Sequence, residues 1–218
     1  EGMMSMDGGS MAGMFDAMGP ERFDEIGGDQ LFEMTSNMDG QHFMVMEADN
    51  AFGMFETMGS DAVMNMEGDQ LGGMFGAMEA HHMHEIGGDQ LFEMAGNMSG
   101  DNFMALDSDS AFGMFETMGS DLVMGLEVEQ LAGMFGAMEH DQIGHMEGGM
   151  VFEAFESMGT EGMMSMDGGS MAGMFDAMGP DNFGAIDGID MFEMAGNMSS
   201  ENFMVMGSDG AFGMFDTM

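Results

Sequence analysis

Cysteine is absent from the chain, and its absence excludes disulfide bonds and thiolate chemistry. The absence of cysteine does not indicate the cellular compartment, since large secreted repeat proteins and acidic intracellular proteins can both lack cysteine. Long apolar runs are absent as well. No stretch reaches the roughly 18 apolar residues that a membrane-spanning helix needs, so no transmembrane segment is predicted.

Positive charge is almost absent. Arg22 is the only formal cation, lysine does not occur, and 41 acidic residues give a net charge of -40. Nucleic acid is therefore not expected as a partner, because neutralising phosphates requires lysine and arginine. Repulsion among so many carboxylates is weakened by salt or by bound divalent cations. Two interpretations stay open: a chain adapted to seawater or brine, or a chain that binds cations such as Ca²⁺ or a mineral.

What the chain does have is a 20-residue repeat. Rows of 20 residues align without insertion or deletion, giving ten full repeats and an eleventh that ends two residues short at Met218. Residues 51–61, for example, recur unchanged as residues 111–121. We therefore predict one repeat array over residues 1–218, with no separate globular domain.

The second half of each row has the apolar spacing of a helix. If each row is numbered 1 to 20, positions 11, 14, 15 and 18 are apolar in most rows and lie on one face of an α-helix. Position 18 is methionine in all eleven rows, so we expect it at the least forgiving point of the core. Carboxylates that precede these positions, such as Asp29, suit the unpaired amides of a helix start.

The first half of each row predicts a shorter helix. Apolar residues occupy positions 3 and 6, and Ser60 followed by Asp61 predicts a capped helix start. Glycine at positions 8 and 19 predicts two turns. Glycine also stands inside the second helix at position 13 in seven rows. Because glycine costs a helix about 1 kcal/mol relative to alanine, we expect a neighbouring helix to approach closely there.

These patterns predict an all-α fold: an α-solenoid whose 20-residue repeats each form two short antiparallel helices. One such unit cannot bury a core alone, so its neighbours must cover both flanks. The first and last rows are as apolar as the middle, which predicts either a segment of a longer array or copies stacked end to end. A 60-residue cycle of row similarity, interrupted by the row at residues 141–160, is explained by recent duplication, or by a superhelix or partner that repeats every third unit.

Residues 28–34 and 128–134 resemble the short-helix repeats of the form Thr-x-x-Gln-x-x-x-Leu found in large bacterial surface and secreted proteins. The resemblance covers mainly the second half of each row. It implies an extended, surface-associated helical array, and it brings no catalytic residues to this chain.

Methionine, with 41 copies, has two interpretations. Thioethers are soft ligands for copper(I), and Met3, Met4 and Met6 form a cluster that recurs within residues 161–166. Methionine also packs adaptably into irregular gaps, and the methionines at positions 14 and 18 lie on the predicted buried face.

Histidines and carboxylates offer further candidate ligands. His81, His82 and His84 cluster in one row only, as an incidental surface group or a metal site. Asp107 and Asp109 lie near a predicted turn, where they form a solvated face or bind divalent cations weakly. No EF-hand loop occurs, because no acidic turn supplies its spaced oxygens.

No nucleophile and base pair, phosphate-binding loop or paired carboxylates can be identified, so we do not expect an enzyme. We expect a structural, self-assembling protein, such as an extracellular filament, adhesin stalk or matrix component, located outside the cell or at its surface. The alternative is a metal-handling protein that binds copper(I) through methionine clusters, or divalent cations or mineral through carboxylates.

Overall fold

The computed structural model describes residues 6–218, and all regular secondary structure in this part of the chain is helical. It contains nineteen α-helices and one 3-10 helix, with no strand among the described residues. The all-α prediction is therefore confirmed. The chain divides into two compact units, Glu1–Leu122 and Val123–Met218.

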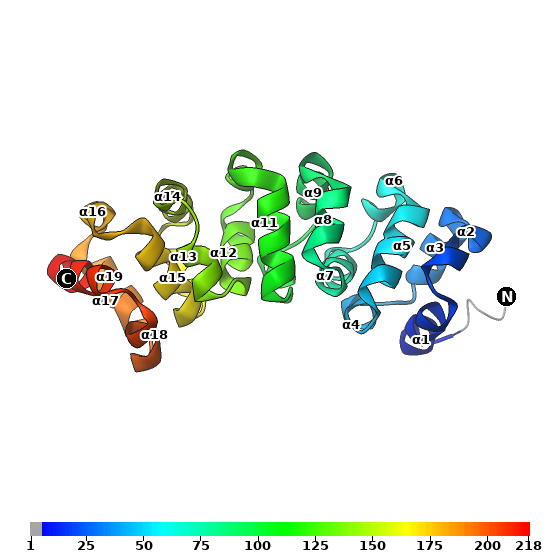
Figure 1. The fold of residues 1–218 in the computed structure, drawn as a ribbon, viewed down its shortest axis with the longest axis horizontal. Helices are drawn as coiled ribbons and strands as arrows, with labels where there is room; N and C mark the ends of the chain where they lie inside the picture. Colours follow the sequence, from blue (N-terminus) through cyan, green and yellow to red (C-terminus); the bar gives the residue numbers. More distant parts are fainter. Residues whose placement is uncertain (1–5) are drawn as a thin grey trace. The chain divides into compact units, whose positions relative to one another are not determined.

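The first unit runs from blue to green in Figure 1. Its elements are α1 (Gly8–Met18), η2 (Pro20–Arg22), α2 (Phe23–Ile26), α3 (Gly28–Thr35), α4 (Gly40–Met44), α5 (Ala48–Met58), α6 (Ser60–Val63), α7 (Gly68–Ala77), α8 (Ala80–Ile86), α9 (Gly88–Ala95), α10 (Gly100–Met104) and α11 (Ser108–Val123). Helix α4 contacts α1 and α7, and α7 also contacts α10. Contacts therefore join helices from successive or next-but-one rows.

The second unit repeats this kind of packing. Its elements are α12 (Val128–Ala137), α13 (His140–Gly144), α14 (Gly148–Ser165), α15 (Gly168–Met178), α16 (Pro180–Phe183), α17 (Gly188–Asn197), α18 (Ser200–Val205) and α19 (Ser208–Thr217). Helix α15 contacts α13 and α18, while α14 contacts α12 and α17. Within residues 6–218, every helix is too short or too polar to cross a membrane.

The core is formed by the predicted helical face. In α5, Ala51 and Met54 are fully buried, and Phe55 lies beside them with 6% of its surface exposed. Burying large apolar side chains in this way supplies the main free energy of folding. Met58, from the position that is always methionine, is buried too but keeps 8% exposure. It therefore lies at the margin of the core, and position 14 lies deeper.

The second helices begin two residues earlier than the carboxylates suggested. Helix α3 starts at Gly28, so Asp29 lies inside its first turn and does not precede it. The residue before the helix is at position 7, where Asp7 of the first row accepts a hydrogen bond from the Ser10 amide at 2.9 Å. An aspartate at position 9 still helps the helix, because negative charge is favourable at its N-terminus.

The predicted cap formed by Ser60 and Asp61 is wrong. Ser60 is the first residue of α6, and the chain turns at Gly59, whose φ of 78° is a conformation that favours glycine. Where position 19 is not glycine, a capping box starts the first helix instead, as between Asp39 and His42. The residues that begin such boxes at position 19 are Asp39, Glu79, Ser99, Glu139 and Ser199.

Glycine at position 13 marks close contact between helices, as predicted. A Cβ built on Gly73 would lie 2.1 Å from the carbonyl oxygen of Gly40, at the start of α4. At Gly113 it would lie 2.8 Å from the Cα of Ala80. Gly13 has no such neighbour within 4 Å. The helix-propensity cost of these glycines is thus offset by packing against a residue 33 positions earlier.

Glycine at position 8 does not form a turn. Gly88 is the first residue of α9, and a Cβ there would lie 2.6 Å from the Thr117 carbonyl oxygen and 3.1 Å from the Met118 Cα. Gly28 meets the backbone of Thr57 and Met58 in the same way. Position 8 needs a small residue in these rows because the end of a later helix lies against it. The sequence of a single row does not show this contact.

Candidate functional site

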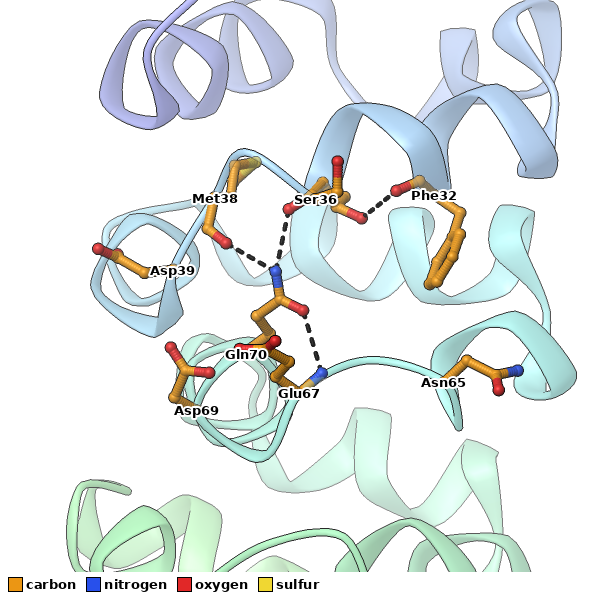
Figure 2. Close-up of a pocket in the computed structure, with 9 residues that line it drawn as sticks. Phe32, Ser36, Met38, Asp39, Asn65, Glu67, Asp69 and Gln70 are labelled. Atoms are coloured by element: carbon orange, nitrogen blue, oxygen red, sulfur yellow. Dashed lines mark hydrogen bonds between the residues drawn. The ribbon is translucent and has the colours of Figure 1, made fainter.

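Polar side chains at position 10 join a row to the row two before it. The Gln70 side chain donates from Nε2 to the carbonyl oxygens of Met38, at 2.7 Å, and Thr35, at 3.1 Å. Its Oε1 accepts the Glu67 amide at 3.1 Å. Figure 2 shows the side-chain amide of Gln70 lying between the start of α7 and the end of α3. Carbonyls at a helix end lack partners within the helix, so Gln70 satisfies them from outside.

Serine makes the same contact in other rows. The Ser110 hydroxyl donates to the Met78 carbonyl oxygen at 2.9 Å, and the Ser170 hydroxyl donates to that of Met138 at 2.9 Å. Both serines are only 1% exposed. A buried hydrogen bond of this kind fixes the spacing between helices, because breaking it leaves polar groups unpaired. We call these contacts the position-10 bonds.

An acidic groove accompanies the position-10 bond at two places in the first unit. The groove beside Gln70 has a volume of 280 Å³, and the groove beside Ser110 has a volume of 540 Å³. The carboxylates that line them are Asp39, Glu67 and Asp69 in the first, and Glu79, Asp107 and Asp109 in the second. Neither lining includes lysine or arginine, so each groove attracts cations electrostatically.

The sequence candidates Asp107 and Asp109 thus lie on one groove, which His81 also lines. Asp107 is already engaged, because its Oδ1 accepts the Ser110 amide at 2.8 Å. The groove is open to solvent, and its oxygens do not converge as those of a calcium loop do.

His82 is buried and has a structural role. It is 3% exposed, and its ring stacks on Phe52 with centroids 4.6 Å apart. Its Nδ1 accepts the Glu79 amide at 3.2 Å and completes the capping box of α8. The Nε2 atom faces Asp49, 3.4 Å from the Oδ1 of that residue. His82 and Asp49 therefore join α8 to α5.

His81 and His84 are both exposed but lie in different surroundings. His81 Nδ1 is 3.4 Å from Glu79 Oε2, and its ring centroid is 3.9 Å from that of His82. His84 Nδ1 contacts the Ala80 carbonyl oxygen at 2.8 Å, as donor. The structure therefore brings two of the three predicted histidines together and adds Asp49 to them, whereas His84 lies outside the group.

The methionine candidates are placed only in part. Met3 and Met4 lie outside the described residues, and Met6 is half-buried. In the identical later row, Met163 is fully buried and Met166 is 5% exposed, so both side chains pack in the core. Packing of this kind uses the flexible thioether to fill gaps between short helices.

One carboxylate has a shifted titration. The backbone amide of Ser10, and then its hydroxyl, hold the pKa of Asp7 below its usual value of 3.8. These donors favour the charged form of the side chain. Asp7 therefore stays ionised while it caps α1.

Sequence reasoning missed Asp49 and Glu79 as neighbours of the histidines. Asp49 precedes His81 and His82 by roughly the offset of the position-10 bonds, and only that offset could have indicated it. Comparison with models of known protein families, with curated proteins and with solved structures finds no match.

Proposed function

We propose that this chain is a structural, self-associating protein, an α-solenoid of 20-residue repeats that assembles with copies of itself. Its acidic, lysine-free composition suits a saline location outside the cell or at its surface. The support comes from apolar surfaces at α1 and α19, which lie in different units. The role proposed is mechanical and adhesive, with no catalytic step.

The observation that carries this proposal is a contrast between equivalent positions. In α19, Phe215 is 65% exposed and Phe212 is 72% exposed. Phe155, which occupies the row position of Phe215 in α14, is 8% exposed. On α1, Met14 and Met18 are half-buried, whereas Met174 in the identical row is fully buried. A second copy that brings α1 against α19 would bury both faces as interior rows are buried. Such a head-to-tail contact between different surfaces continues from copy to copy.

The proposal is tested by the mass of the full chain, measured by light scattering or sedimentation over a range of protein concentrations. Raising the salt from about 0.01 M to about 1 M shortens the Debye length from about 30 Å to about 3 Å, which removes most repulsion between copies of charge -40. We expect the mass to rise with both protein and salt concentration. A mass that stays monomeric throughout overturns the proposal.

The double substitution Phe212→Gln and Phe215→Gln identifies the surface. Each phenylalanine buried on association contributes about 1.5–3 kcal/mol, so the pair should weaken association by a factor of 100 or more. Val45→Gln is the matched control, since Val45 is 72% exposed in the other unit. If both variants associate as the wild type does, this surface is not the interface.

A further inference from the structure

Asp49, His81 and His82 bring three ligand groups together from two rows. One nitrogen or oxygen from each lies within 4.8 Å of the others. Asp49 comes from the first turn of α5, and the two histidines come from α8. Imidazole nitrogen with a carboxylate oxygen suits Zn²⁺ and the related divalent transition metals, whereas Ca²⁺ takes oxygen ligands alone.

His82 is held in place before any ion arrives. Burial and stacking on Phe52 fix its ring, so its Nε2 points at Asp49. The separation of 3.4 Å from Nε2 to Oδ1 is long for an N–H···O hydrogen bond. Two ligands on a tetrahedral ion with bonds of about 2.1 Å lie about 3.4 Å apart. The pair is therefore spaced as ligands of one ion are spaced.

His81 has the second feature of a metal-binding histidine. Its Nδ1 lies 3.4 Å from Glu79 Oε2. A carboxylate beside one ring nitrogen favours the tautomer with the proton on that nitrogen, which leaves the other nitrogen free to bind metal. The His81 and His82 rings are also only 3.9 Å apart.

We propose that Asp49, His81 and His82 bind one divalent transition-metal ion, represented by Zn²⁺, with Glu79 as a positioning residue for His81. The site is distinct from the self-association surfaces of α1 and α19. A metal on His82 Nε2 leaves the ring proton on Nδ1, where the Glu79 amide now donates its hydrogen bond. Ion binding therefore opens the capping box at the start of α8.

The test is a titration of the full chain with Zn²⁺ in excess Ca²⁺, which occupies the surface carboxylates. His82→Gln and His81→Gln each remove a ligand. His82→Gln keeps the capping box, because Glu139 with Gln142 forms the same box at α13. We expect one Zn²⁺ per chain for the wild type and no tight binding for either variant. Circular dichroism of each variant confirms that it is folded.

Two matched controls separate this site from scattered histidines. His42→Gln changes the other histidine that closes a capping box, and His84→Gln changes the histidine outside the cluster. Both variants should bind Zn²⁺ as the wild type does. Glu79→Gln should weaken binding about 10- to 100-fold, because it removes the carboxylate that orients His81.

Two spectroscopic measurements report on geometry. Co²⁺ in place of Zn²⁺ should give the visible absorption of a four-coordinate site, and the Glu79 amide resonance should shift as its hydrogen bond opens. The proposal is overturned if Ca²⁺ displaces all bound Zn²⁺, if binding is not one to one, or if His81→Gln and His82→Gln bind as the wild type does.

Discussion

Gly13 and Gly173 occupy the same position in two rows of identical sequence, residues 1–20 and 161–180. Only Gly173 has a close neighbour: a Cβ there would lie 2.9 Å from the His140 carbonyl oxygen, whereas nothing lies within 4 Å at Gly13. We predict that Gly13→Ala raises the free energy of unfolding by about 1 kcal/mol through helix propensity. Gly173→Ala should lower the free energy of unfolding by up to about 2 kcal/mol. Overpacking costs about 1–3 kcal/mol, and the helix-propensity gain of about 1 kcal/mol offsets only part of this cost.

Because the two rows have the same sequence, the helix-propensity effect of the substitution is the same in both. The difference in unfolding free energy between the two variants therefore measures packing alone. Urea unfolding followed by far-ultraviolet circular dichroism is the suitable assay, because the chain has no tryptophan or tyrosine for fluorescence. Gly53→Ala adds a comparison inside the same unit as Gly13, since its Cβ would lie 2.5 Å from the Pro20 Cβ. If Gly53→Ala and Gly173→Ala stabilise the chain as much as Gly13→Ala does, the close helix contacts are refuted.

Two more predictions concern polar groups. Ser110→Ala removes the buried donor to the Met78 carbonyl oxygen and should destabilise the chain by about 1–3 kcal/mol in urea unfolding, while exposed Ser36→Ala should change stability by less than about 0.5 kcal/mol. The pKa of Asp7 is lowered on folding, so its cap contributes stability above the unfolded pKa, and this is lost as pH falls through the lower, folded value. Acid titration of helix content should therefore show a smaller loss in Asp7→Asn than in wild type, and equal titration of the two would contradict the cap.

The buried helical face was predictable because the spacing of apolar residues within a single row indicates it. Positions 11, 14 and 15 recur at helical spacing, and Ala51, Met54 and Phe55 are buried as that spacing indicates. The close contact at position 13 was predictable for the same reason: an internal glycine such as Gly73 needs compensation, and a neighbouring helix supplies it.

What could not be predicted depends on contacts about 30 residues apart. Gly88 looks like a turn residue until the Thr117 carbonyl is placed beside it. Ser60 looks like a cap, but the turn at Gly59 makes it the first helical residue. Asp49 has no sequence feature that distinguishes it from other aspartates, and only the offset between packed rows brings it to His82.

The contact across 33 positions also bears on how such a chain can lengthen. Gly73 and Gly113 face Gly40 and Ala80, whereas Glu93, at the same row position, follows Ser60 by the same 33 residues. A row is therefore matched to the row two before it, not only to its own sequence. Inserting a single row would change the partners of the rows next to the insertion, while later rows would keep theirs. Copying three rows at once keeps these partners matched, in agreement with the 60-residue cycle of row similarity.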